Sequence, residues 1–240
     1  MNIALIGYGK MGKEIERIAL RRGHSIVLTV DETNAMTFTD EELKKADVAI
    51  EFSTPESVYV NILRCFKTGI PVVAGTTGWM DKIEAVKEEC AKSQAAFFYA
   101  SNYSIGVNIF FQLNRYLAAI MEKYAEYEPT VDETHHIYKK DSPSGTGITL
   151  ANDILAALNR KKNWIEGGSD EPGMLQIHSK REGNVPGTHS IKYSSDIDDI
   201  EIIHTAHNRR GFALGAILAA EWIAGKKGVF GMHDLMGDCG

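Results

Sequence analysis

NIALIGYGKMG, residues 2–12, is the stretch of sequence that decides the fold of this chain. Its first five residues, Asn2–Ile6, read as a buried strand, and a helical pattern follows over Met11–Arg22. The glycines between them form a GxGxxG motif, which lets the backbone turn tightly, approach a pyrophosphate and pack the helix on the strand. The stretch therefore predicts a dinucleotide-binding βαβ unit whose cofactor contacts are Gly7, Tyr8, Gly9, Lys10, Met11 and Gly12. The alternative is that the glycines only form a tight turn.

An acidic residue stands where the ribose of such a cofactor is expected. Asp31 follows the second predicted strand, Ser25–Val30, about 20 residues beyond the glycine motif. Its carboxylate can accept hydrogen bonds from ribose hydroxyls and would repel a 2′-phosphate, and Glu32 adds a second negative charge. We therefore expect NADH to be preferred to NADPH or used equally well, with Lys10 partly compensating for the two carboxylates. In the alternative interpretation, Asp31 is a solvated residue at a strand end.

Short strands alternate with helices through the N-terminal part of the chain. Further strands are predicted at Val48–Phe52, Pro71–Ala74 and Ala96–Tyr99, with helices at Glu56–Lys67 and Met80–Lys92. This alternation is typical of a parallel, doubly wound sheet, so the first domain is predicted to be an α/β Rossmann-type domain.

The carboxyl ends of these strands offer further cofactor contacts, because ligands of open α/β sheets collect there. The turns after the third, fourth and fifth strands can supply hydrogen bonds to the ribose, the pyrophosphate and the nicotinamide. The candidate residues in these turns are Phe52, Ser53, Gly75, Thr76, Thr77, Ala100, Ser101, Asn102 and Tyr103. The alternative is that all three segments are ordinary strand-to-helix turns.

The pattern changes after Asn102, which predicts a second, α+β domain. A helix is expected over Gly106–Tyr124 and another over Ile148–Asn159, and a last helix over Gly211–Ala224 either closes this domain or packs back on the first. The remaining β-rich runs predict a mixed or antiparallel sheet. They are Thr130–Tyr138, Met174–Arg181, His189–Ser194 and Glu201–His207.

The string HHIYKKDSPSGTG, residues 135–147, gathers two imidazoles, two ammonium groups and a glycine-rich helix start. Imidazoles exchange protons near neutral pH, and the start of a helix favours a carboxylate or phosphate. The string therefore predicts a site that holds an anion and moves a proton. The alternative is a basic surface loop that leads into a helix.

Composition excludes several other classes of protein. The 240 residues contain no apolar run near the ~20 residues that a membrane span requires, and a net charge of −6 disfavours nucleic acid as a partner. Met1 leads directly into a strand pattern without the features of a secretory signal, so a cytoplasmic location is expected. Neither the three cysteines, Cys65, Cys90 and Cys239, nor the pair His204 and His207 has metal-ligand spacing, so we expect no metal site.

Seven motifs in order give the chain a resemblance to a known family. They are GYGKMG, EFSTPE, GTTG, ASNYSIGVN, ETHHIYKKDSPSGTG, REGNVPGTH and HTAHNRRGFALGA. Together they resemble the dihydrodipicolinate reductase (4-hydroxy-tetrahydrodipicolinate reductase) family, the nicotinamide-dependent reductases of lysine and diaminopimelate biosynthesis. The resemblance implies a dinucleotide-binding domain of residues 1–104 and 213–240, to which the C-terminal helix returns. It also implies a substrate-binding and tetramerisation domain of residues 105–212, and a homotetramer.

The same resemblance implies roles for single residues. His135 matches the family's proton donor, Lys139 matches a lysine at a substrate carboxylate that is also a candidate donor, and His136 matches a substrate-binding histidine. Gly145 and Thr146 match the pair that holds the other carboxylate of a small cyclic imine dicarboxylate. The implied reaction delivers hydride from NADH or NADPH to C4 of the ring, with loss of the 4-hydroxyl as water. Ser142 and Gly147 depart from the family motif, where alanines are expected.

Two other classes of function remain open from the residues alone. One is another two-domain nicotinamide-dependent dehydrogenase, acting on an amino or aldehyde acid, which needs the first domain but not the paired-histidine string. The other is a non-catalytic dinucleotide sensor, which would tolerate the loss of His135 and Lys139.

Overall fold

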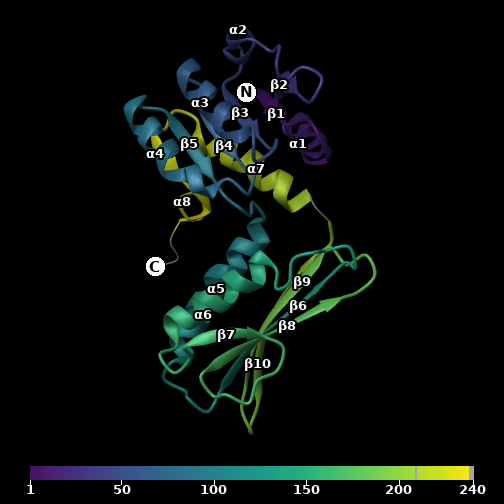
Figure 1. The fold of residues 1–240 in the computed structure, drawn as a ribbon, viewed down its shortest axis with the longest axis vertical. Coiled ribbons are helices and arrows are strands. Elements are labelled where there is room, and N and C mark those ends of the chain that lie inside the picture. Colours follow the sequence, from purple (N-terminus) through teal and green to yellow (C-terminus); the bar gives the residue numbers. More distant parts are fainter. Residues whose placement is uncertain (209, 238–240) are drawn as a thin grey trace. The chain divides into compact units, whose positions relative to one another are not determined.

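The chain forms two compact units in a computed structural model that describes residues 1–208 and 210–237. The first unit consists of Met1–Ile105 together with the segment that begins at Arg210, and the second unit begins at Gly106 (Figure 1). The return to the first unit at Arg210 comes ahead of the expected boundary at residue 213, because the whole of the last long helix belongs to the first unit. Cys239 lies outside the described residues.

The first unit contains a six-stranded sheet in which every strand pair is parallel. Its strands are, in spatial order, β11 (Gly228–Phe230), β5 (Ala96–Tyr99), β4 (Val72–Ala74), β3 (Val48–Glu51), β1 (Asn2–Ile6) and β2 (Ser25–Val30). The central strands are apolar on both faces because helices cover both sides of the sheet. The predicted Rossmann-type fold is confirmed, and β11 adds a strand that the sequence patterns did not predict.

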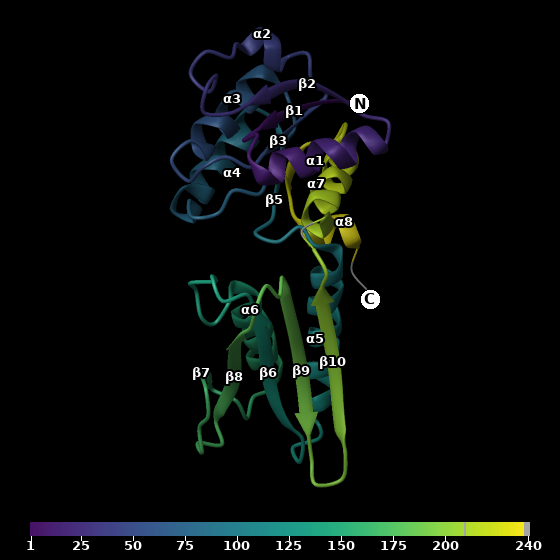
Figure 2. The same ribbon diagram turned by 90° about the vertical axis from the view of Figure 1, so that its right-hand side faces the viewer.

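Helices form two layers against this sheet (Figure 2). α1 (Lys10–Arg21) and α7 (Arg210–Ile223) pack together on one face, where their apolar residues join one hydrophobic core. α3 (Val58–Thr68) and α4 (Ile83–Lys92) cover the other face and close a second core. Two shorter helices, α2 (Asp40–Leu43) and α8 (Met232–Met236), complete the unit. The last long helix therefore packs on the first unit, which decides between the two alternatives left open by its sequence.

The second unit contains a five-stranded mixed sheet (Figure 2). Its strands are, in spatial order, β10 (Asp199–Ala206), β9 (Gly187–Ser194), β6 (Glu128–His135), β8 (Met174–Arg181) and β7 (Asn163–Glu166). The pairs β6–β8 and β7–β8 are parallel, whereas β6–β9 and β9–β10 are antiparallel. The sheet is mixed because α6 connects β6 to β7 across one face, so that these two strands run in the same direction. β7 was not predicted from the sequence.

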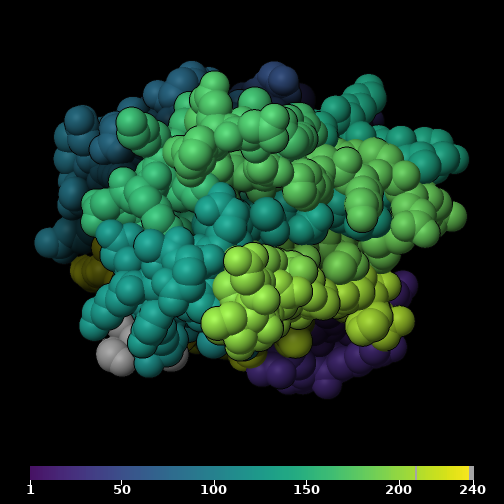
Figure 3. Space-filling view, turned by 90° about the horizontal axis from the view of Figure 1, so that it is seen from below, coloured from purple at the N-terminus to yellow at the C-terminus, as the bar shows by residue number. Residues whose placement is uncertain are grey.

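Two helices cover one face of this second sheet. α5 (Ile105–Met121) and α6 (Gly145–Ala157) pack their apolar sides on Val131, Ile177 and Ile191 of the strands. The opposite face carries half-buried and exposed side chains, and Ile203 on β10 is 59% exposed. Figure 3 shows the turn between β9 and β10 at the surface of the molecule. The second unit therefore has one closed and one open face.

Among residues 1–208 and 210–237, no helix combines the length and the apolar character that crossing a lipid bilayer requires.

Candidate active site

The glycine motif forms a tight turn between β1 and α1. Gly7 has a φ of +102°, and a Cβ atom there would lie 2.0 Å from the carbonyl oxygen of Phe52. A Cβ atom on Gly12 would lie 2.4 Å from the carbonyl oxygen of Gly7. Gly9 precedes the helix without a side-chain cap, so the first N–H groups of α1 are left for a ligand. This bare helix start beside a close turn is the arrangement that a pyrophosphate requires.

Two side chains of the motif lie at the surface beside this turn. Tyr8 is half-buried and its hydroxyl donates a hydrogen bond to the carboxylate of Glu16, which raises the pKa of Tyr8. Lys10 is exposed at the first position of α1. An ammonium group at this position adds positive charge to the N-terminal end of the helix.

Asp31 lies directly after β2, as the sequence predicts. Its Oδ1 accepts hydrogen bonds from the backbone N–H of Thr33 at 2.8 Å and from the hydroxyl of Thr33 at 2.6 Å. These bonds lower the pKa of Asp31, so the carboxylate is charged at neutral pH. Glu32 beside it is exposed. The end of β2 is therefore a fixed negative charge at the position where a ribose is expected.

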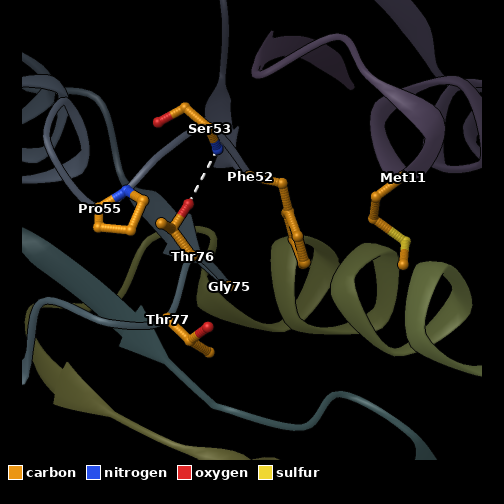
Figure 4. A pocket seen from close by; sticks show the side chains of 7 residues that line it. All are labelled: Met11, Phe52, Ser53, Pro55, Gly75, Thr76 and Thr77. Atoms are coloured by element: carbon orange, nitrogen blue, oxygen red, sulfur yellow. Dashed lines mark hydrogen bonds between the residues drawn. The ribbon is translucent and has the colours of Figure 1, made fainter. Parts of the chain in front are cut away.

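A pocket of about 260 Å³ opens beyond the ends of β3 and β4 (Figure 4). The residues that line it come from α1 and from the turns after these two strands. They are Met11, Phe52, Ser53, Pro55, Gly75, Thr76 and Thr77. The ring of Phe52 lies against Gly75, where a Cβ atom would come within 2.2 Å of the ring. The structure thus gathers predicted cofactor residues from three separate segments around one pocket.

A buried carboxylate that the sequence analysis did not single out lies behind this pocket. Glu51 at the end of β3 is fully buried and accepts hydrogen bonds from the hydroxyl of Thr76 at 2.7 Å, from the amide of Asn61 at 3.2 Å and from the hydroxyl of Ser53. Burial raises the pKa of Glu51, and these hydrogen bonds oppose the rise. Ser53 and Thr76 donate their hydroxyl protons to Glu51, and the hydroxyl oxygen of Thr76 also accepts the backbone N–H of Ser53 at 2.8 Å, so the carboxylate fixes the turns after β3 and β4 against each other.

The segment Ala100–Tyr103 places its tyrosine in the core of the first unit. Tyr103 is 2% exposed, and its hydroxyl donates to the carbonyl of Ala74 at 2.7 Å. Its ring lies 5.7 Å from the ring of Phe52, centroid to centroid. Ser101 is exposed, whereas Asn102 is half-buried and accepts a hydrogen bond from the backbone N–H of Ser104. The ring of Tyr103 therefore packs against Phe52 from within the core of the first unit.

In the second unit, the end of β6 carries the predicted proton donor. β6 buries alternate residues, so Glu133 and His135 lie on the same buried face of the sheet. The predicted strand extended to Tyr138, but β6 ends at His135, and the next residues form a loop. The strand register puts His189 of β9 opposite Glu133 and Arg181 of β8 opposite His135. The sheet itself therefore assembles the four groups.

Burial governs the ionisation of these groups. The rings of His135 and His189 lie 4.9 Å apart in an edge-to-face arrangement. Burial lowers the pKa of His135, and the negative charge of Glu133 opposes this shift. Burial and the charge of the nearby His135 lower the pKa of His189 to about 4. Burial acts to raise the pKa of Glu133, but hydrogen bonds from Ser144 and the charge of His135 outweigh it and lower that pKa. At neutral pH the cluster thus holds a carboxylate beside two imidazoles.

The ligating atoms of Glu133, His135 and His189 all lie within 4.8 Å of one another, and these are atom types that bind transition metals. Both oxygens of Glu133, however, already accept hydrogen bonds from Ser144. The geometry is therefore that of a hydrogen-bonded cluster.

The loop after β6 carries the second predicted functional group. Lys139 donates hydrogen bonds from its ammonium to both carboxylate oxygens of Asp141, at 2.9 and 2.8 Å. Arg181 donates to the backbone carbonyl of Asp141 at 2.7 Å and so ties the loop to β8. His136 is half-buried, with its ring 6.3 Å from the ring of Tyr138. Two cations therefore lie at this end of the second sheet.

The start of α6 is built to accept an anion. Ser144 caps the helix by accepting a hydrogen bond from the backbone N–H of Gly147 at 3.0 Å. Gly145 and Thr146 are the first two residues of the helix, and their N–H groups have no acceptor within it. Nothing lies within 4 Å of a Cβ atom built on Gly145, so a ligand can approach its backbone. The predicted carboxylate-binding pair has the exposure that this role needs.

Sequence reasoning thus named most of the residues that the structure gathers, but it missed Glu51 and Glu133. Glu51 ends an apolar strand, and Glu133 occupies a buried position of a strand with alternating burial. A charged residue at such a position was the one feature of the sequence that could have indicated a functional role. The sequence of each strand does not reveal the cross-strand and turn residues that satisfy the charge.

Comparisons with known proteins assign both units of the chain to one family. Residues 1–103 match the family model described as the N-terminus of dihydrodipicolinate reductase, and residues 106–236 match that described as its C-terminus. A 4-hydroxy-tetrahydrodipicolinate reductase of Christiangramia forsetii is 50% identical over 239 residues, 99% of this chain and 98% of the relative. One from Methanosarcina mazei is 38% identical, covering 81% of this chain and 75% of the relative.

A solved structure shares the fold. It is a dipicolinate-bound dihydrodipicolinate reductase from a Paenisporosarcina species, with a TM-score of 0.76 and 21% identity, covering 96% of this chain and 97% of that one. Two family models that between them match nearly the whole chain, and a full-length relative at 50% identity, show that the chain belongs to the dihydrodipicolinate reductase family.

Proposed function

We propose that this chain reduces 4-hydroxy-tetrahydrodipicolinate to tetrahydrodipicolinate with NADH or NADPH, in lysine and diaminopimelate biosynthesis. The observation that carries the proposal is the relative of that name, half identical over 99% of this chain. The reaction consumes one hydride and one proton and releases the 4-hydroxyl as water. A bound reduced nicotinamide supplies the hydride, and the residues of the two units supply binding, alignment and the proton.

In the first unit, the glycine turn fits the pyrophosphate and Asp31 fits a ribose. Gly7 and Gly12 leave no room for side chains, and the uncapped start of α1 offers N–H groups to phosphate oxygens. The pocket beside Phe52, Ser53 and Thr76 fits the nicotinamide half, since it opens at the carboxyl ends of β3 and β4, where ligands of open α/β sheets collect. The proposed cofactor contacts therefore all lie at the carboxyl ends of parallel strands.

Cofactor choice follows from the charge at the end of β2. Asp31 is ionised and Glu32 is exposed next to it, so a 2′-phosphate would approach two negative charges. Lys10 at the start of α1 partly offsets them. We therefore propose that NADH is preferred to NADPH or used equally well.

In the second unit, each of the two substrate carboxylates has its own binding group: backbone N–H groups bind one and an ammonium binds the other. Gly145 and Thr146 offer the free N–H groups of α6 to one carboxylate, and the ammonium of Lys139 faces the other. His136 lines the same loop and contributes to substrate binding. His135, buried beside Glu133, supplies the proton when its imidazole is charged. Substrate binding and proton delivery thus come from one sheet end and one helix start.

Assembly and location belong to the same proposal. The open face of the second sheet, with Ile203 exposed on β10, supports a homotetramer built through that sheet. A monomeric mass in light scattering would contradict this part. A cytoplasmic location fits a reductase that draws on the cell's pool of reduced nicotinamide.

A coupled assay tests the proposed reaction. The substrate is generated in situ from pyruvate and aspartate semialdehyde by the preceding synthase, and NADH absorbance is followed. We expect oxidation of NADH only when both the synthase and this chain are present. Oxidation with aspartate semialdehyde alone would instead identify a dehydrogenase of an aldehyde acid. Tight NADH binding without turnover in any mixture would identify a dinucleotide sensor.

A further inference from the structure

The carboxylate of Glu133 is the best-connected buried charge in the second unit, and none of the roles proposed above uses it directly. Its side chain is fully buried on the inner face of β6. The Oε1 atom accepts the backbone N–H of Ser144 at 2.9 Å and the hydroxyl of Ser179 at 3.1 Å, and Oε2 accepts the hydroxyl of Ser144. A charge buried with this many donors is costly to disrupt.

Three elements of the site meet at this carboxylate. Ser144 is the cap of α6 and directly precedes Gly145 and Thr146, whose N–H groups are proposed to hold a substrate carboxylate. On the sheet side, His135 Nδ1 lies 3.9 Å from Oε1, and His189 Nε2 lies 3.6 Å from Oε2. The hydroxyl of Ser144 also lies 3.2 Å from His189 Nε2. Glu133 therefore links the substrate-binding helix start to the proton-donating strand.

We propose that Glu133 is a positioning residue for the reduction: its carboxylate fixes the start of α6 through Ser144 and keeps a negative charge beside the imidazole of His135. This inference rests on the proposed role of His135 as proton donor. It assigns two separable effects to one side chain, a hydrogen-bonding effect on substrate binding and a charge effect on proton delivery.

The charge effect follows from the surroundings of His135. Burial is the main factor that disfavours a positive charge on this imidazole, and Lys139 in the loop and Arg181 on β8 act in the same direction. The ring of His189 on β9 packs against it at 4.9 Å. Glu133 on β6 and Asp141 in the loop favour that charge. Asp141 is largely exposed and already bonded to Lys139, whereas Glu133 is buried, where charges interact most strongly. Glu133 is therefore the main group that keeps His135 able to carry its proton.

Glu133→Gln tests the charge effect because glutamine has the same shape. Its carbonyl oxygen can still accept the N–H of Ser144, and its amide can donate to the hydroxyl of Ser144. We measure kcat and KM from pH 5 to 9 and titrate His135 by NMR in the parent and the variant. kcat should fall with rising pH in both proteins. In the variant, we expect the pH midpoint of this fall and of the His135 titration to lie about one pH unit lower, so that kcat at pH 7.5 drops about tenfold. KM for the substrate should change less than threefold.

Asp132→Asn is the matched control, because it removes the same charge from the next residue of β6, on the opposite face of the sheet. Its pH profile and its kcat should stay within about twofold of the parent. Ser144→Ala tests the hydrogen-bonding effect, since it removes one of the two bonds between Glu133 and α6. We expect a KM about tenfold higher, with the pH of the kcat fall unchanged.

The proposal is overturned if Glu133→Gln lowers kcat equally at every pH and the His135 titration does not move. If that variant does not fold, Glu133→Asp replaces it, because aspartate keeps the charge and shortens the reach to Ser144. A His135 titration within half a unit of the parent together with a raised KM then supports the proposal, and a lowered titration overturns it. His135→Gln separates the proposed role of Glu133 from the proposed role of His135 as proton donor. If this variant keeps the pH-dependent fall of kcat, His135 is not the proton donor. The NMR titration of His135 in the Glu133 variants then still tests whether Glu133 acts on that imidazole.

Discussion

Lys139 donates hydrogen bonds to both carboxylate oxygens of Asp141, so the lysine proposed to bind a substrate carboxylate already binds one from its own chain. An ammonium has three donors, which leaves one N–H for a substrate oxygen without breaking the pair. We predict that Lys139→Ala raises KM for the substrate about 10- to 100-fold, as expected when a charged hydrogen bond of roughly 1.5–3 kcal/mol is lost. It also lowers kcat if the substrate ring is then misaligned or if Lys139 is the proton donor.

Lys140 is the matched control for this variant, because it is exposed and carries the same charge at the next position. Lys140→Ala should leave KM within about twofold. Equal effects of the two substitutions on KM in steady-state kinetics would mean that only the net charge of the loop matters.

His135→Ala removes the proposed proton donor. Because a general acid acts mainly in the transition state, kcat should fall by about 10²–10⁴ with a smaller change in KM. His178→Ala on the outer face of β8, paired with Asp132, serves as the control and should keep the parent kcat. A kcat/KM within a few-fold of the parent in His135→Ala would remove His135 from the mechanism.

His189 makes the stability of the protein depend on pH. Its pKa is lowered to about 4 in the folded state, below the usual 6.5, so the unfolded chain binds more protons between these two values. The contribution of neutral, buried His189 to the free energy of unfolding is thus fully present above pH 6.5 and is lost as pH falls toward 4. Over this window it amounts to about 3 kcal/mol at most.

Urea unfolding at several pH values between 7 and 4 measures this loss. His189→Gln, which cannot be protonated, should lose clearly less free energy of unfolding than the parent as pH falls. Parallel curves for the two proteins would show that His189 is not the group responsible.

Asp31 determines cofactor choice in the proposed function. Asp31→Ala removes an ionised carboxylate held by Thr33, and kcat/KM for NADH should fall about tenfold, the loss of one or two hydrogen bonds of ~1 kcal/mol. NADPH should lose less, because the same change removes a repulsion. Glu32→Ala keeps Asp31 in place and removes only the second negative charge, so it should shift the ratio of kcat/KM values toward NADPH less than Asp31→Ala does. A parent enzyme that prefers NADPH tenfold would make the assignment of Asp31 wrong.

The order of the main strands and helices in the first unit could be predicted because continuous apolar runs and the glycine motif are local signals. β11 and β7 escaped prediction because they are edge strands whose residues are half-buried or exposed, so they lack the continuous apolar run that marks the equally short β4. Tyr103 illustrates a further limit. The sequence placed it correctly in the turn after β5 but could not show that its hydroxyl binds Ala74 in the core. Side-chain direction in a turn depends on tertiary packing.

The return of the chain to the first unit at Arg210 has a consequence for the order in which the protein folds during synthesis. The second unit is one continuous segment, so all of its strands are available before the ribosome reaches α7. The first unit must wait, because α7 supplies buried residues such as Ala216 and Ile217 to one of its two cores, and β11 forms the edge of its sheet. Until those last residues emerge, α1 is the only one of the two helices that covers this face of the sheet, and apolar residues that α7 later buries stay exposed to other chains.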